Sequence, residues 1–185
     1  MSVHLTINNR QLRSGFTLVE LLVVIAIISF LVAAATYSWT NAQQKGRDGR
    51  RKADLKAVQQ TLELYFQTWG KYPAAGTGAD AGKIACNTGT NPTTNGDNTA
   101  KAWGAVFSCD PDGTAGTQTA VIYMQQLPKD PVGPSGRPEY FYSTSSNTTY
   151  KLNASLENAN DPDINPPSNL PCTADSGYNY CVIQP

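Results

Sequence analysis

The sequence predicts an α+β protein in which one long N-terminal helix packs on a small antiparallel sheet. No proline occurs between Phe16 and Pro73, so a helix can run through this whole interval. The first part of the interval is almost continuously apolar, and the second part has apolar residues three and four positions apart. The C-terminal part of the chain alternates apolar and polar residues, which is typical of half-buried antiparallel strands.

The apolar run extends from Phe16 to Ala35 and is interrupted only by Thr17, Glu20 and Ser29. About 20 helical residues span about 30 Å, the thickness of a bilayer core. Residues 16–36 are therefore predicted to span a membrane, after a polar and basic segment at residues 1–15. A cleaved export signal is an alternative, because the small residues 33–35 resemble a signal-peptidase site.

Residues 37–73 are predicted to continue the helix as an amphipathic segment that enters the soluble domain. Gly46 and Gly49 weaken it by about 1 kcal/mol each relative to alanine and could permit a bend. Gly70 and then Pro73 should end it. The apolar stripe consists of Leu55, Val58, Leu62, Tyr65, Phe66 and Trp69. The opposite face carries Lys52, Asp54, Lys56, Gln60, Glu63 and Gln67.

Residues 74–185 are predicted to form the globular domain. Residues 74–119 are rich in Gly, Thr, Asn and Asp and should form a long loop region, anchored to the core by the apolar patch 103–107. Residues 121–127 form a short apolar segment, either helix or strand. Two antiparallel strands are predicted at 139–143 and 149–157, and the second should bury Tyr150, Leu152, Ala154 and Leu156.

All four cysteines, Cys86, Cys109, Cys172 and Cys181, follow the apolar run. An even number on one side of a membrane segment suggests two disulfides in an oxidising compartment, with buried free thiols as the alternative. Three pairings are possible, and Cys86–Cys109 with Cys172–Cys181 is favoured because each closes a short loop. This placement predicts a cytoplasmic N-terminus and a globular domain outside the cytoplasmic membrane.

Charge and motifs argue against several functions. Lys+Arg and Asp+Glu number 14 each, so no overall charge favours nucleic acid. The basic residues at Arg10, Arg13 and 45–52 are interpreted as an orientation signal or a solvated helix face. The only histidine is His4, and no nucleophile, metalloprotease or phosphate-loop motif occurs, so we do not expect an enzyme.

The loop after the second predicted strand is rich in oxygen ligands. Glu157, Asn158, Asn160, Asp161 and Asp163 lie close together in sequence, and calcium takes six to eight oxygens from such loops. Calcium at Asp161 and Asp163 is therefore a candidate, and it is the one cofactor that the sequence suggests. A solvated polar loop shaped by Pro162 is the alternative.

Glu20 lies inside the apolar run, where a charge costs about 2.5–3.5 kcal/mol at the helix centre and less near its end. Intramembrane carboxylates normally have partners. A cut just before Phe16 would create one, the α-amino group of Phe16, about 6 Å along the axis from Glu20. In an axially shifted neighbouring copy this amine could meet the carboxylate directly. Alternatively, Glu20 lies near the interface and reaches headgroups.

The segment G-F-T-L-V-E at 15–20, after a basic leader and before an apolar helix, resembles the class III signal of type IV pilins and type II secretion pseudopilins. The resemblance implies that a prepilin peptidase cleaves between Gly15 and Phe16 and N-methylates Phe16. It implies that Glu20 pairs with the Phe16 amine of an adjacent subunit. It also implies a pilin-like fold.

Residues 51–73 and the segment L-P-K-D-P-V-G-P-S-G-R-P-E-Y-F-Y at 127–142 are similar to the major, G-type pseudopilin, with Val132 where tryptophan is usual. The family often binds calcium in the following loop, which maps onto Asp161 and Asp163. The resemblance implies a subunit that polymerises with itself in a pseudopilus for protein export. A type IV pilus subunit is the alternative, since disulfide-closed tails are common in pilins, and a binding protein with an ordinary signal anchor is a third.

The implied partners are the prepilin peptidase, an inner-membrane assembly platform with its ATPase, minor pilins or pseudopilins, and the membrane. The implied location is the cytoplasmic membrane, crossed once, and later a filament outside the cytoplasm.

Overall fold

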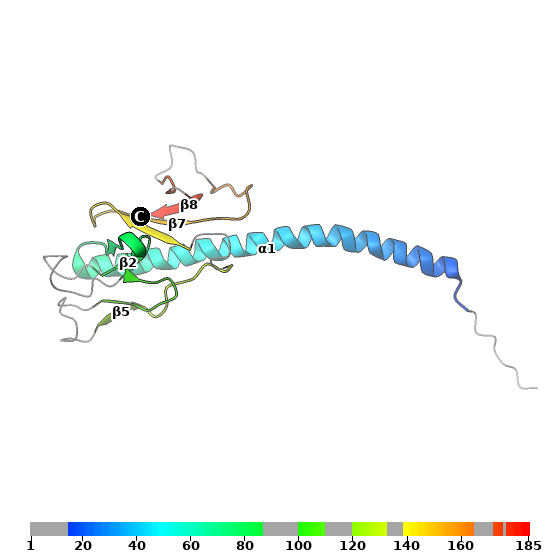
Figure 1. The fold of residues 1–185 in the computed structure, drawn as a ribbon, viewed down its shortest axis with the longest axis horizontal. Helices are drawn as coiled ribbons and strands as arrows, with labels where there is room; N and C mark the ends of the chain where they lie inside the picture. The colour runs from blue at the N-terminus through cyan, green and yellow to red at the C-terminus, as the bar shows by residue number, and fades with distance from the viewer. Residues whose placement is uncertain (1–14, 87–99, 110–119, 133–138, 165–171, 176) are drawn as a thin grey trace, which may run out of the picture. The chain divides into compact units, whose positions relative to one another are not determined.

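The computed structural model describes residues 15–86, 100–109, 120–132, 139–164, 172–175 and 177–185, and divides the chain into two compact units, 1–42 and 43–185 (Figure 1). In chain order the elements are α1 (Leu18–Trp69), β1 (Ala74–Ala75), η1 (Gly78–Asp80), β2 (Ile84–Ala85), β3 (Ala100–Lys101), β4 (Phe107–Cys109), β5 (Val121–Met124), β6 (Phe141–Thr144), β7 (Tyr150–Ala154) and β8 (Tyr180–Ile183). The α+β prediction is confirmed.

Helix α1 is helical through both Gly46 and Gly49, which the sequence singled out as weak points. It ends at Trp69, as predicted. Gly70 adopts a left-handed conformation with φ of 67°, and its N–H donates to the carbonyl of Phe66 at 2.7 Å. A glycine in this conformation closes the last turn without the steric penalty that a side chain would bring.

In the first unit, the apolar side chains of α1 between Leu18 and Val32 are exposed, each by 46 % or more. By length and composition this part of the helix can cross a membrane. An apolar surface of this extent is unstable in water, so lipid or other protein must cover it.

In the second unit, α1 supplies one side of the core. Leu55, Val58, Leu62 and Tyr65 are fully buried, as their spacing predicts, whereas Phe66 is 36 % exposed. The buried face is wider than the predicted stripe, because it also includes the polar side chains of Asp48, Arg51, Gln59 and Thr61.

Strands β6, β7 and β8 form a three-stranded antiparallel sheet in that order, and β7 and β8 lie side by side in Figure 1. Strand β7 buries Tyr150, Leu152 and Ala154 as predicted, but the alternation is incomplete because Asn153 is also fully buried, with its side chain bonded to Asp175. It is shorter than predicted because the chain changes its hydrogen-bond partners beyond Ala154. The N–H of Leu156 donates to the side chain of Asn179 at 2.7 Å.

Two segments differ from the sequence-based description, which allowed either helix or strand for residues 121–127. Strand β8 lies in the tail that was expected to be a loop, and it pairs with β7 at Cys181 and Val182. Residues 74–119, also expected to be a loop region, contribute short strands β1 to β4. Residues 121–124 form a strand, β5. Trp103 and Phe107 are buried and anchor their segment to the core as predicted.

Candidate functional site

Glu20 is held at the beginning of α1 by Thr17. Its Oε2 atom accepts hydrogen bonds from the backbone N–H of Thr17 at 2.9 Å and from its hydroxyl at 2.8 Å. The N–H of Glu20 in turn donates to the Thr17 hydroxyl at 3.2 Å. This reciprocal pattern is a capping box, in which a threonine and a glutamate three residues later satisfy the donors at a helix N-terminus.

The capping box provides a local partner for Glu20 that our sequence analysis missed. The T-x-x-E spacing before an apolar run was the available signal. Both donors from Thr17 are neutral groups, so they bring no positive charge to the carboxyl group, which lies at the positive end of the helix dipole. Both hydrogen bonds reach Oε2, and no protein group within the described part of the chain bonds to Oε1.

Gly15 and Phe16, the predicted processing residues, precede the first turn of α1. They have no regular secondary structure, and the Phe16 side chain is 81 % exposed. A backbone outside a helix can adopt the extended form that peptidases bind, so this segment is suited to cleavage.

A buried charge cluster joins α1 to two loops of the second unit. The Arg51 guanidinium is fully buried and contacts three carboxylates. It binds Asp130 in a bidentate manner, at 2.5 Å from Nε and 2.9 Å from Nη2, and donates from Nη1 to Asp48 and Glu157 at 2.8 Å each. Arg47 also contacts Glu157. Such pairing is what allows a charge to stay inside a protein.

Asp48 connects the cluster to the backbone of the loop after β7. Its carboxylate accepts the N–H groups of Glu157 and Asn158 at 2.8–3.1 Å. Together with Asp130 from the L-P-K-D-P segment, these contacts dock both loops on one face of α1. The interpretation of residues 45–52 as an orientation signal or solvated face is therefore wrong for Arg47, Arg51 and Lys52, which bind acidic residues about 80 to 110 positions away.

The cluster stabilises its charged forms. The hydrogen bond from Arg47 lowers the pKa of Glu157 to about 2, and Arg51 contributes in the same direction despite the opposing effect of burial. Burial alone would raise the pKa of Asp130, but hydrogen bonds from Arg51 and the N–H of Val132 hold it below its usual value. Glu157 and Asp130 are thus charged at neutral pH.

Asp161 and Asp163, the calcium candidates, share one ammonium group. Lys52 Nζ lies 2.7 Å from Asp161 Oδ1 and 2.6 Å from Asp163 Oδ2. In the described part of the chain, no three or more His, Cys, Asp or Glu side chains are grouped so that they could hold a metal ion. Calcium binding at these residues stays a prediction.

The structure joins Cys86 to Cys109 and Cys172 to Cys181, the pairing that the loop lengths favour. The first disulfide links β4 to the residue after β2, and Cys86 and Cys109 are fully buried. The second holds β8 to the preceding segment. Both disulfides therefore stabilise strands that have only two to four residues.

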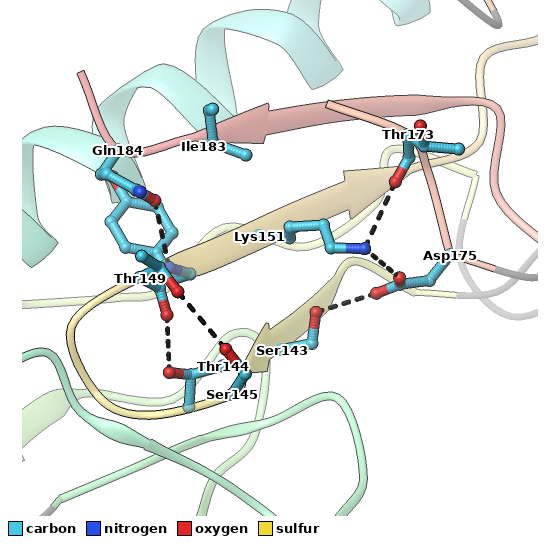
Figure 2. A pocket seen from close by; sticks show the side chains of 10 residues that line it. Ser143, Thr144, Ser145, Thr149, Lys151, Thr173, Asp175, Ile183 and Gln184 are labelled. Atoms are coloured by element: carbon cyan, nitrogen blue, oxygen red, sulfur yellow. Dashed lines mark hydrogen bonds and ion pairs between the residues drawn. The ribbon is translucent and has the colours of Figure 1, made fainter. Parts of the chain in front are cut away.

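A hollow of about 480 Å³ lies over β6 and β7 and is lined mainly by polar side chains (Figure 2). Figure 2 shows its polar groups bonded to one another. Lys151 Nζ lies 2.7 Å from Asp175 Oδ1, and Ser143 donates to Asp175 Oδ2 at 2.8 Å. Asp175 thus links Lys151 of β7 to Ser143 of β6.

Comparison with known proteins gives three kinds of result. A family model described as the prokaryotic N-terminal methylation motif matches residues 10–36. The chain is 29 % identical over 72 residues to the type II secretion system core protein G of Aeromonas hydrophila and 31 % over 72 residues to that of Pseudomonas aeruginosa. It is 34 % identical over 58 residues to the type IV major pilin protein PilA of Myxococcus xanthus. No solved structure matches.

These similarities cover only part of each protein. The two secretion-protein matches include 39 % of this chain and 50 % and 51 % of the relatives, so the chain spans about half of their length. The pilin match includes 31 % of this chain and 26 % of the relative.

Replacing Arg51 by methionine should destabilise the second unit by about 3–5 kcal/mol, because it leaves buried carboxylates without their cation. Thermal unfolding of the full chain in detergent micelles measures this, at about 2–4 °C per kcal/mol. Arg50→Met is the matched control: its side chain is 67 % exposed and lies 4.0 Å from Asp54, so it should cost less than about 1 kcal/mol. Equal melting temperatures for the two variants would contradict the role of Arg51.

Because the pKa of Glu157 is lowered in the folded protein, the free energy of unfolding depends on pH. A carboxylate with a pKa of about 2 when folded and 4.5 when unfolded contributes stability that is complete above pH 4.5 and lost as the pH falls toward 2. The contribution is at most about 3 kcal/mol. Melting temperatures measured across this range should fall less steeply for Glu157→Gln than for the wild type. Glu139→Gln, outside the cluster, should retain the wild-type dependence, and an unchanged profile for Glu157→Gln would refute the assignment.

Proposed function

We propose that this chain, whose N-terminal motif and relatives are similar to those of type IV pilins and type II pseudopilins, is a major structural subunit of a type II secretion pseudopilus. The observation that carries the proposal is the exposed apolar half of α1, with one carboxylate at its beginning. Two of its relatives are core G proteins of type II secretion systems. The subunit performs no catalysis itself and acts by polymerising.

Processing is the first step of this role. A prepilin peptidase cuts between Gly15 and Phe16 and methylates the new amine of Phe16. The methylation motif covers both residues, and neither lies in the helix. Cleavage removes the polar basic segment and leaves α1 close to the new N-terminus.

Assembly then depends on the charge of Glu20. The capping box aims the carboxylate toward the N-terminal end of the helix and leaves Oε1 for a cation. In an adjacent subunit shifted along the axis, the Phe16 amine supplies that cation. An ion pair in a dry helix bundle attracts far more strongly than one in water, and the pair forms only at the axial shift that brings the amine to the carboxylate.

The exposed apolar side chains in the first half of α1 also drive assembly. While the subunit is in the cytoplasmic membrane, lipid covers the side chains of the apolar run. An assembly platform with its ATPase transfers the helix from lipid into the bundle of subunits, so that these side chains never meet water. Minor pseudopilins and the globular unit outside the cytoplasm complete the assembly, and the two disulfides suit that oxidising location.

A type IV pilus subunit is the second candidate. The match to a major pilin and the disulfide that closes the C-terminal tail both favour it. In that case the same α1 chemistry builds a surface fibre for adhesion, motility or DNA uptake instead of driving export. A binding protein with an ordinary signal anchor would leave the methylation motif without a use.

Two substitutions at Glu20 separate its charge from its capping role. Glutamine also serves at this position of a capping box, so Glu20→Gln keeps the cap and removes the charge, whereas Glu20→Ala removes both. We expect both variants to be cleaved at Gly15 and both to assemble poorly. Loss of even ~1.4 kcal/mol per contact weakens subunit addition about tenfold. Fibre yield after shearing, N-terminal cleavage and protein export are the measurements.

The pairing mechanism is wrong if Glu20→Gln assembles like the wild type while Glu20→Ala does not, because capping alone would then be required. Loss of fibres with unchanged protein export would favour the pilus over the pseudopilus. Thr40→Ala, on the same helix but beyond the apolar run, is the control and should assemble normally.

A further inference from the structure

The loop that follows β7 is held on α1 by three cationic side chains from two adjacent helical turns. Arg47 and Arg51 bind Glu157, and Lys52 binds Asp161 and Asp163. The sequence suggested calcium for this loop because of its oxygen-rich composition. In the structure, the positive charge beside Asp161 and Asp163 comes from α1.

Lys52 is placed as a bridging cation. Its side chain is 26 % exposed, and Nζ contacts one oxygen of each carboxylate, at 2.7 Å for Asp161 and 2.6 Å for Asp163. The amine also lies 5.6 Å from the centre of the Tyr180 ring in β8. Burial lowers the pKa of Lys52, but the bonds to the two carboxylates more than offset this and raise it, so the ammonium is charged at neutral pH.

The turn at residues 158–164 is organised by Asp161, one of the two carboxylates that contact Lys52. Asp161 Oδ1, which accepts from Lys52, also accepts the N–H of Asp163 at 3.0 Å. The carbonyl of Asp161 accepts the N–H of Ile164 at 3.1 Å, and that of Asn158 accepts the N–H of Asp161 at 2.9 Å. The position of the ammonium and the conformation of the turn therefore depend on each other.

A metal ion would have to compete with these contacts. Calcium needs six to eight oxygens, preferably with several carboxylates. Glu157, the carboxylate nearest in sequence, is engaged by Arg47 and Arg51, and Asp161 and Asp163 already share Lys52. A divalent ion placed beside the ammonium would also meet its repulsion.

We propose that the Lys52 ammonium is the cation that organises the 157–163 loop, so that the folded protein needs no divalent metal at Asp161 and Asp163. This inference concerns the globular unit and does not depend on the proposed filament role. It predicts that calcium chelation leaves the fold and its stability unchanged.

The test compares Lys52→Met with Lys56→Met in the full chain in detergent micelles. Lys56 lies one turn further along α1 and contacts only Gln59 by the bonds seen in the described residues. We expect Lys52→Met to melt roughly 2–4 °C below the wild type and to be cut faster by protease in the loop, whereas Lys56→Met should match the wild type. Wild-type melting should be the same with EGTA and with millimolar calcium.

Two results would overturn the proposal. One is a Lys52→Met variant that melts and resists protease like Lys56→Met, since Lys52 would then not organise the loop. The other is a rise in wild-type melting temperature with calcium that Asp161→Asn abolishes, since the loop would then take a metal in spite of Lys52. Because neither measurement uses filaments, failure here would leave the proposed function untouched.

Discussion

Helix α1 has to be stable in two environments: apolar surroundings around its first half and the core of a small domain around its second half. The polar contacts of the rest of the molecule depend on this constraint. The first half of α1 presents apolar side chains on all sides, so it suits lipid or a bundle of identical helices. The second half is the core helix of a small domain. Each half needs a different way to satisfy its polar groups. At the apolar end, where no water accepts hydrogen bonds from the free N–H groups, Thr17 and Glu20 satisfy the first donors of the helix between themselves.

At the other end, polar contacts specify how the domain packs. The buried Arg51 with Asp48, Asp130 and Glu157 fixes two loops against one face of α1. A buried network of this kind adds little net stability compared with an apolar core, but a partner missing from it is costly. It therefore selects one arrangement of loops. Lys52 extends the same principle to Asp161 and Asp163, where the family resemblance suggested a metal ion.

The spacing of apolar residues in the sequence predicted which faces of the helix and of one strand are buried. The spacing of Leu55, Val58 and Leu62 indicated the buried face of α1, and the alternation of Tyr150, Leu152 and Ala154 indicated β7. Asp48 lies only three positions from Arg51 on α1. The other partners of Arg51 and Lys52 could not be predicted in this way, because they lie 79 to 111 positions away and only the fold brings them together. Strand β8 was missed because four residues beside a disulfide carry little periodicity. The Thr17 cap was present in the sequence and was overlooked.

The N-terminus of the mature protein is the central chemical feature of the proposed assembly. Glu20 places a carboxyl group at the beginning of the apolar helix, and the amine that would pair with it exists only if the chain is cut before Phe16. Mass spectrometry of the protein purified from its native membrane tests this most directly. The account predicts a mature chain that begins with N-methylated Phe16 and carries both disulfides. A chain that begins after Ala35, or one that retains residues 1–15, would contradict it.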